Sequence, residues 1–508
     1  MTAMGNKNKS SLLNAATAMG MTLVNGLLGI VVTWFVIASF GDDFNGLNST
    51  ANQIVNILLI LEGGFTVASN VALFGPLGRQ ETDTVNGILS ATRQKFRKIG
   101  VLFLLIGLAV AVGYSFAVNS SLPWDFVFTL IVMTVVPAAF NLYYATTYRV
   151  LLQTQQKEYI INLFTILTVA LGHIANIVMI RLNGPMWMVR FNTMLFTLLC
   201  SLLIAGYVKK HNPAINLKAP PRPELIRGTA DVMAQKVTGV IYKSAPIIFL
   251  TLSPTGGTAL ASVYAVYNNV FTMLKNLLHG IIDAPRHSLG QLLTERERED
   301  VYPVFAAYEY VAFLAIFVML TTCCVLILPF IGLYTYGFGD NINYYDGLIA
   351  ILMVITTVIE MLHIPSGHLL NMAGCFRISR NFQIITCIVL VITMAIGGLF
   401  WGVYGMLGAV LLCAVLLAIL ETGYVHTRFF EKKLTNLTLQ LLPLCLTGIG
   451  VCFLEMQLQL QIKSYFQFIL WGIGLVAVNT LAAAAVSLIC NRKVFLSLLR
   501  RIKGLLKR

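Results

Sequence analysis

The sequence predicts an all-α polytopic membrane protein that crosses the bilayer about fourteen times. Of its 508 residues, 57% are hydrophobic and only 11% are charged, whereas soluble domains carry about 25% charged residues. Apolar stretches long enough to cross a hydrocarbon core, which takes roughly 20 helical residues, recur along the whole chain. The loops between them are too short to hold a folded soluble domain.

The apolar stretches divide the chain into consecutive expected spans. They lie at 12–40, 47–77, 99–118, 125–149, 159–181, 186–208, 231–253, 258–285, 302–333, 344–372, 382–402, 404–427, 438–456 and 464–490. The first stretch is too long for the apolar core of a cleaved signal peptide, so we expect it to remain as a membrane helix.

Basic residues gather in alternate loops between these spans. Most of the 35 lysines and arginines fall in one set of loops, while the opposite set holds Arg181 and Lys463. The positive-inside rule therefore places both termini in the cytoplasm and the chain in the cytoplasmic membrane. The net charge of +14 belongs to that membrane surface. Because no basic segment carries a nucleic-acid-binding motif, no nucleic acid is expected as a partner.

The spans predict two lobes and an extension. We expect an N-terminal six-helix lobe at 1–208 and a C-terminal six-helix lobe at 231–427, joined by a proline-containing cytoplasmic linker at 209–230. Two additional membrane helices occupy 428–490. The tail at 491–508 alternates apolar and basic residues at helical spacing, which predicts an amphipathic cytoplasmic helix bound to anionic membrane lipids.

Three lysines fall inside expected spans. Lys236 and Lys243 share one face of the span at 231–253, and Lys275 lies near the middle of the span at 258–285. An ammonium group at mid-helix costs about 2.5–3.5 kcal/mol on insertion scales, so such groups usually face a bundle interior or a water-filled cavity.

Other polar residues accompany these lysines within the membrane. Glu62, in the span at 47–77, is the candidate charge partner of one lysine. Glu360 and His363, at i, i+3 spacing in the span at 344–372, form a weaker candidate for a proton or metal site, and a hydrogen-bonded helix contact is the simpler interpretation. A polar stripe at i, i+4, i+7, i+11 spacing consists of Asn268, Thr272, Lys275 and His279.

Two interpretations of these charges remain open at this point. In the first, the ammonium groups outnumber the carboxylates at this depth and line an electropositive cavity suited to an anion. In the second, one Lys–Glu pair holds two helices together and the other lysines extend to the interface. The nine cysteines show no CxxC spacing, so neither a disulfide framework nor a metal site is indicated.

The segment at 40–80 carries a recognisable set of motifs. It contains "GLNS" at 46–49, "LEGG" at 61–64, and then Leu73, Pro76 and Leu77 before a basic loop. This arrangement resembles the polysaccharide-transport families of the multidrug/oligosaccharidyl-lipid/polysaccharide exporter superfamily. The expected two six-helix lobes agree with that superfamily, and the two additional helices agree with its polysaccharide and lipid-linked branches.

The resemblance implies a flippase that moves a polyprenyl-pyrophosphate-linked oligosaccharide, a precursor of cell-surface polysaccharide, to the outer leaflet by alternating access. Lys236, Lys243 and Lys275 would then supply the cationic central cavity that family members share, and Glu62 would couple release to H⁺ or Na⁺ or keep the empty lysines apart. No cofactor is implied, and polysaccharide polymerases or glycosyltransferases are the implied class of partner. The first span has no arginine, which favours an O-antigen, capsule or teichoic-acid type transporter over exporters of lipid-linked peptidoglycan precursors.

Two other functions stay open. Cation-coupled efflux of small drugs occurs in the same superfamily, although a basic cavity does not suit a cationic drug. A membrane-embedded glycan polymerase or ligase is less expected, because the outer loops, such as those at 41–46 and 182–185, are too short to form an acceptor site. We therefore expect a transporter rather than an enzyme.

Overall fold

The computed structural model describes residues 2–226, 230–283, 286–338, 342–458, 460–492 and 495. These residues form helices and short connections, with no β-strand among them. Most of the expected tail helix at 491–508 lies outside the described residues. By contacts, the chain divides into two compact units, Met1–Val266 and Tyr267–Arg508. The expected lobe boundaries at 208 and 231 remain a prediction.

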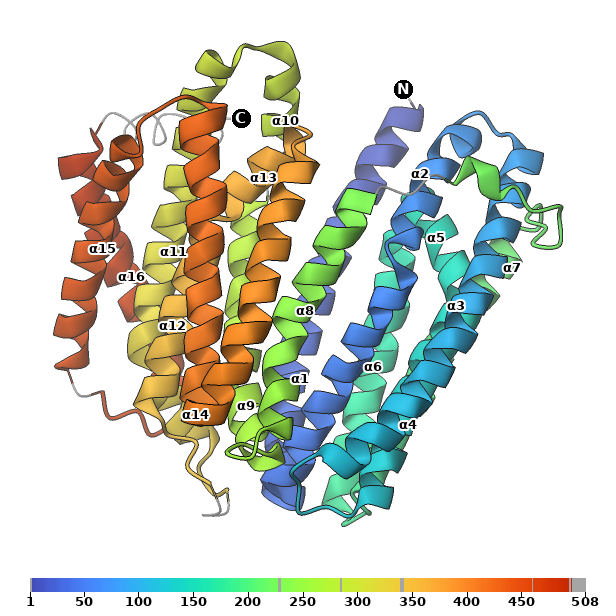
Figure 1. The fold of residues 1–508 in the computed structure, drawn as a ribbon, viewed down its shortest axis with the longest axis horizontal. Helices are drawn as coiled ribbons and strands as arrows, with labels where there is room; N and C mark the ends of the chain where they lie inside the picture. The colour runs from blue at the N-terminus through green and yellow to red at the C-terminus, as the bar shows by residue number, and fades with distance from the viewer. Residues whose placement is uncertain are drawn as a thin grey trace. The chain divides into compact units, whose positions relative to one another are not determined.

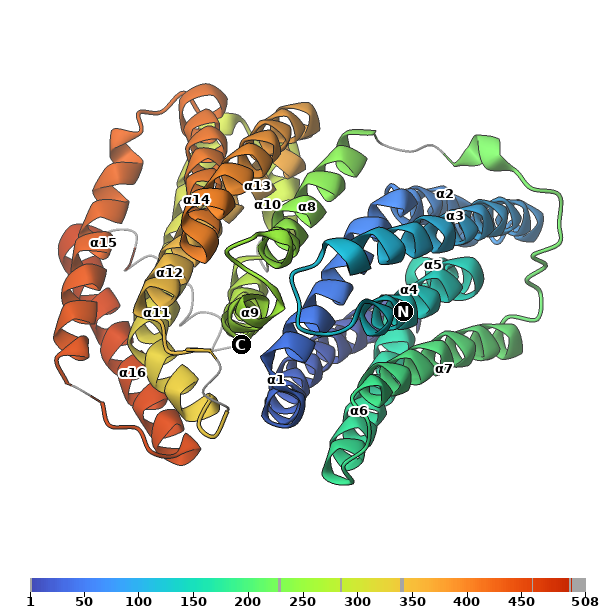
Figure 2. The ribbon, with the colours of Figure 1, turned by 60° about the horizontal axis from the view of Figure 1, so that its bottom comes forward.

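The first unit holds eight helices and the start of a ninth, inside which the unit boundary falls. Helices α1 and α6 pack together, as do α6 and α7, and α8 packs along α1 (Figures 1 and 2). The helices are α1 (Thr2–Leu58), α2 (Phe65–Gly78), α3 (Thr82–Ala117), α4 (Trp124–Phe140), α5 (Thr146–Thr154), α6 (Glu158–Arg181), α7 (Trp187–His211), α8 (Ala230–Leu252) and α9 (Thr258–Ile282).

The second unit is built around α11, which contacts α12, α15 and α16. The two helices expected beyond the lobes, α15 and α16, therefore pack onto α11 of this unit. Its helices are α10 (Arg286–Glu295), α11 (Arg298–Tyr334), α12 (Gly347–Leu362), α13 (Ile364–Met372), α14 (Phe376–Tyr424), α15 (Thr435–Met456) and α16 (Tyr465–Cys490). A π-helical turn, Val425–Phe429, follows α14 directly.

Two long helices contain sharp bends at glycines. Helix α1 bends at Gly41 (φ 83°) and α14 at Gly402 (φ 56°), so each joins two expected spans without a separate loop. These left-handed backbone angles favour glycine. The arms of α14 run back alongside each other (Figure 1). They pack backbone to backbone, because a Cβ on Gly397 would lie 2.5 Å from the carbonyl oxygen of Gly405.

The expected span at 47–77 is a broken helix. Helix α1 ends at Leu58, a 3₁₀ turn covers Leu59–Glu62, and α2 begins at Phe65. Gly63 and Gly64 occupy the break with φ angles of 56° and 72°. The sequence signal for the break is the glycine pair itself, since two successive left-handed residues end an α-helix.

Ten of the described helices or helix pairs are long and apolar enough to cross a membrane, as expected of a multi-pass membrane protein. Two of them, Ala16–Glu62 and Phe376–Phe429, include the glycine bends and combine expected spans. The lysine-bearing helices α8 and α9 are not among the ten.

One end of the first unit is fastened by polar contacts between α1 and the start of α9. Asp43 accepts a hydrogen bond from the Thr258 hydroxyl at 2.5 Å, and Asn45 donates to Ser262 at 2.7 Å. Gly46 permits this approach, because a Cβ there would lie 1.6 Å from the carbonyl oxygen of Thr258. The glycine of the "GLNS" motif is thus a packing requirement.

Candidate functional site

The helix break at residues 59–64 places Glu62 against α8. Its Oε2 lies 3.2 Å from the Nζ of Lys236. The Glu62 side chain is 12% exposed and that of Lys236 is 41% exposed. The sequence predicted a lysine partner for Glu62, and the structure identifies it as Lys236.

Lys243 lies two turns further along α8 and is exposed. It forms no ion pair within the described part of the chain. The neighbouring Ser244 is buried and donates to the Oε1 of Gln53 at 2.9 Å, which fastens α8 to α1. Asn56 donates to the same oxygen at 3.0 Å. With Ser244 directed at α1, Lys243 is left on a surface of α8 where no described carboxylate forms an ion pair with it.

A second lysine–glutamate pair lies in the other unit. The Nζ of Lys275 on α9 is 3.2 Å from the Oε2 of Glu360 on α12, with side-chain exposures of 26% and 13%. In the predicted polar stripe of α9, Thr272 is exposed and Asn268 is half-buried. His279 lies 3.5 Å from Asp283 through its Nδ1. Glu360 therefore pairs with Lys275, a residue that its spacing to His363 did not indicate.

These contacts revise the expected charge balance. Two of the three membrane lysines have one carboxylate each, so the excess of ammonium groups predicted from the sequence reduces to Lys243 among the described residues. Among the described residues, each unit holds one Lys–Glu pair. The roles assigned to these residues in binding or coupling remain predictions.

His363 is paired with a carboxylate that the sequence analysis did not select. Its Nδ1 lies 2.8 Å from the Oε2 of Glu421, which is 2% exposed, and Ser379 donates to Oε1 at 3.3 Å. A Cβ on Gly367 would lie 2.8 Å from the same Oε2. Glu421 is 58 residues from His363, so local spacing gave no indication of the contact.

Two further histidine–carboxylate contacts were also missed. His426 and Glu309 are both fully buried, with Nε2 3.1 Å from Oε2. His368 lies 3.3 Å from Asp283 through Nε2. Ionisable residues inside membrane helices were the available signal, and Glu309, Glu421 and His426 each lie inside an expected span.

Arg190 is a buried cation in the first unit. From the sequence, Arg190 was expected just inside the span at 186–208, next to an outer loop. Its guanidinium donates to the backbone carbonyl of Asn48 and, at 3.1 Å, to the Oδ1 of Asn52. Arg190 therefore satisfies polar groups of α1 just beyond the "GLNS" glycine, and this contact is structural.

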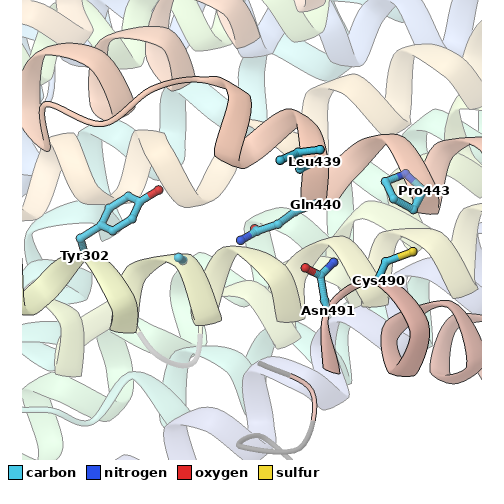
Figure 3. A pocket seen from close by; sticks show the side chains of 7 residues that line it. Tyr302, Leu439, Gln440, Pro443, Cys490 and Asn491 are labelled. Atoms are coloured by element: carbon cyan, nitrogen blue, oxygen red, sulfur yellow. The ribbon is translucent and has the colours of Figure 1, made fainter. Parts of the chain in front are cut away.

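A cavity of about 580 Å³ lies between α11, α15 and α16 (Figure 3). Its lining combines apolar side chains with uncharged polar ones, and no lysine, arginine or carboxylate of the described residues belongs to it. The lining residues are Tyr302, Ala306, Leu439, Gln440, Pro443, Cys490 and Asn491. This chemistry does not suit a charged headgroup, and the membrane lysines lie on other helices.

No protein-family model and no curated protein matches the sequence. Solved structures do match the fold. The lipid II flippase MurJ in an inward closed conformation superposes with a TM-score of 0.70 at 12% identity, over 95% of this chain and 99% of that one. A multidrug resistance MATE family transporter of the MOP superfamily in an inward-facing conformation has a TM-score of 0.62 at 13% sequence identity, over 81% of this chain and 96% of that one. A multidrug resistance MATE family transporter of the same superfamily in an outward-facing conformation has a TM-score of 0.57 at 14% identity, over 82% of this chain and 95% of that one.

These matches confirm the predicted fold class and the resemblance to exporters of that superfamily at the level of the fold. The MurJ structure covers a larger share of this chain than the two MATE structures do. At 12–14% identity the likeness concerns chain architecture alone, so the substrate has to be argued from this chain's own residues.

Proposed function

We propose that the protein is a flippase that moves a polyprenyl-pyrophosphate-linked oligosaccharide across the cytoplasmic membrane by alternating access, as a precursor of cell-surface polysaccharide. The observation that carries the proposal is Lys243, an exposed ammonium group on α8, within the expected span at 231–253, with no ion pair among the described residues. A charge in such a place requires water or an anionic ligand. The shared fold with a lipid II flippase supports the same substrate class.

The lysines suit a substrate that must be released. An ammonium group binds phosphate oxygens as a compact point charge, whereas an arginine holds them in a fixed bidentate geometry. Lys236 and Lys243 lie on one helix and would bind the pyrophosphate together, while the polyprenyl chain remains in lipid. Lys275, on α9 of the second unit, stays a proposed anion-binding residue of that unit.

Glu62 would act as an internal competitor of the substrate in this scheme. It holds Lys236 at 3.2 Å in the absence of a ligand, and a pyrophosphate group would have to replace it. Because a partly exposed ion pair contributes only about 0–1 kcal/mol, the replacement costs little. When the glycan leaves, the carboxylate returns to the lysine and opposes rebinding.

The test is flipping by the full-length protein in liposomes, with a fluorescent polyprenyl-pyrophosphate-linked oligosaccharide as the probe. We expect loss of flipping in a variant that combines Lys243→Gln with Lys275→Gln and Glu360→Gln. The last change prevents an unpaired carboxylate from destabilising the second unit. Lys157→Gln, in a loop, is the control. Wild-type flipping by the triple variant would contradict the proposal.

Cation-coupled drug efflux is the second candidate, favoured by the likeness to multidrug MATE transporters. A cationic drug needs a carboxylate free of lysine, yet Glu62 and Glu360 are each held by one. We therefore expect no change in accumulation of an ethidium-type dye when the protein is expressed. Dye efflux that depends on Glu62 would favour this candidate instead.

A further inference from the structure

Two cations and three tyrosines meet at one end of the first unit. They come from α3, α5, α7 and a π-helical turn, Asn141–Ala145, which joins α4 to α5. Helices α3, α5 and α7 all pack against this turn (Figures 1 and 2). We name the group the tyrosine–cation cluster, which consists of Arg97, Lys209, Tyr143, Tyr144 and Tyr148.

Aromatic groups hold the ammonium group of Lys209 in place. Its Nζ donates a hydrogen bond to the Tyr144 hydroxyl at 3.1 Å. The same atom lies 5.3 Å from the centroid of the Tyr144 ring and 5.9 Å from that of Tyr148, within the range at which a ring face attracts a cation. Phe140 stacks on Tyr144 from the preceding turn, with centroids 5.3 Å apart. Lys209 is therefore positioned by neutral side chains, and its charge is not cancelled.

Arg97 is held in a similar way on α3. Its Cζ lies 5.1 Å from the centroid of the Tyr143 ring. Gly100 permits the close approach of α3 to the π-helical turn, because a Cβ there would lie 3.0 Å from both the backbone nitrogen and the Cβ of Tyr143. The Nε of Arg97 is buried without a hydrogen-bond partner in the described structure. The guanidinium is thus fixed against a ring with donor capacity left over.

The cluster carries a positive charge that no described carboxylate compensates. Arg93 lies one helical turn before Arg97 on the same face of α3 and is close enough to Lys209 for the two charges to repel each other. Within the described part of the chain, no carboxylate forms an ion pair with Arg93, Arg97 or Lys209. An anion placed between these groups would relieve the repulsion, so the cluster suits a ligand with a negative charge.

The cluster lies where the chain is expected to leave the bilayer. Arg93 and Arg97 directly precede the expected span at 99–118, and Lys209 directly follows the one at 186–208. This is the side on which the basic loops gather. Tyrosine is enriched at such boundaries, and basic pockets between membrane helices on this side bind the headgroups of anionic lipids.

Exposed apolar side chains continue from the cluster toward the middle of the membrane. On α3, Val101 and Leu105 follow Arg97 at i+4 and i+8 spacing, and both are exposed. On α7, Leu202 precedes Lys209 by two helical turns and is exposed as well. A soluble anion would need only the cations. A phospholipid would use both parts, the cations for its phosphate and the apolar faces for its acyl chains.

We propose that the tyrosine–cation cluster binds the headgroup of an anionic glycerophospholipid, whose acyl chains lie along α3 and α7. The phosphate oxygens accept hydrogen bonds from the ammonium group of Lys209 and the guanidinium of Arg97, and such charge-assisted bonds are stronger than neutral ones. The rings keep both cations in position before the lipid arrives, which lowers the cost of ordering them on binding. None of these residues belongs to the lysine site on α8, so the lipid site goes beyond the proposed function and does not rest on it.

The experiment compares the binding of fluorescent phosphatidylglycerol and phosphatidylcholine to purified full-length protein in detergent. We expect the wild type to prefer phosphatidylglycerol, and Lys209→Gln to lower the affinity for it about fivefold, the contribution of one basic residue near a membrane surface. Lys210→Gln is the matched control, because it removes the same charge from an exposed neighbour outside the cluster. It should leave the affinity unchanged.

A second matched pair tests the other cation. Arg97→Gln should weaken phosphatidylglycerol binding, and Lys98→Gln, at an exposed position of the same helix, should not. Lys209→Arg keeps the charge and should keep the affinity. Because Lys209 is exposed, its replacement leaves no buried group unpaired, and an unchanged Tm in phosphatidylcholine checks that the variant is folded.

Three results would each overturn the proposal. Equal losses in the cluster variants and their controls would mean diffuse attraction to the basic surface. Equal affinity of the wild type for phosphatidylglycerol and phosphatidylcholine would mean that the rings hold the cations for packing alone. Displacement of the bound lipid by soluble glycerol phosphate would mean that the cluster takes a soluble anion.

Discussion

Glu62 Oε2 lies 3.2 Å from Lys236 Nζ at the point where the first long helix breaks. The break, built on Gly63 and Gly64, directs a carboxylate toward a lysine 174 residues away in the sequence. A continuous helix would carry Glu62 along a regular face instead. The "LEGG" segment therefore positions the Glu62 carboxylate next to Lys236. The effect of this carboxylate on substrate affinity can be measured.

The first prediction concerns Glu62→Gln. Removing the competing carboxylate frees Lys236, so polyprenyl pyrophosphate should bind more tightly. If the Lys236–Glu62 pair contributes about 1 kcal/mol, the affinity should rise about fivefold. Binding to the purified full-length protein measures this effect. Glu81→Gln, which removes a surface ion pair with Arg79 in the same unit, should leave affinity unchanged. Weaker binding in Glu62→Gln would show that the carboxylate assists the anion.

The second prediction concerns Gly46→Ala. The added Cβ would meet the Thr258 carbonyl at 1.6 Å, which forces α1 and α9 apart. We expect a loss of about 3 kcal/mol in stability, at the upper end for overpacking, seen as a lower Tm in detergent. Gly29→Ala, in the same helix with no atom within 4 Å of its Cβ, is the control. Equal Tm values for the two variants would disprove the close contact.

The third prediction concerns the hairpin in α14. A Cβ on Gly405 would lie 2.1 Å from the carbonyl oxygen of Gly397, so Gly405→Ala should separate the two arms and lower the yield of monodisperse protein in size-exclusion chromatography. The neighbouring Gly398 has open space around its Cβ. Gly398→Ala should therefore behave as the wild type. Normal yield for Gly405→Ala would mean that the arms do not pack in this way.

Much of the helix pattern could be predicted from the sequence, because each membrane helix must bury a long apolar stretch. The sequence divides the spans at both glycine bends, between 40 and 47 and between 402 and 404. It did not show that the helix continues through Gly41 and Gly402, where the left-handed backbone of one glycine makes each bend. The break at Gly63 and Gly64 was signalled by adjacent glycines, yet it lies inside the expected span at 47–77.

The sequence predicted which residues belong to the candidate site better than it predicted which of them form ion pairs or hydrogen bonds with one another. Lys243 was found because a charge in an apolar span is rare. Glu360 and His363 were grouped by their spacing, yet their partners, Lys275 and Glu421, lie 85 and 58 residues away. Helix spacing defines which residues share a face, whereas tertiary packing decides what that face meets.

We propose that Lys243 binds the anionic group of the substrate. The most direct measurement is the affinity of polyprenyl pyrophosphate for full-length protein carrying Lys243→Gln or Lys243→Arg, with uncharged polyprenol as the reference lipid. Because Lys243 has no carboxylate partner in the described chain, its neutralisation leaves no unpaired charge behind. We expect Lys243→Gln to lower the affinity about tenfold or more, the effect of losing one charge-assisted contact. Lys243→Arg should keep the affinity, and polyprenol binding should not change. Equal affinity of the wild type and Lys243→Gln for polyprenyl pyrophosphate would contradict it.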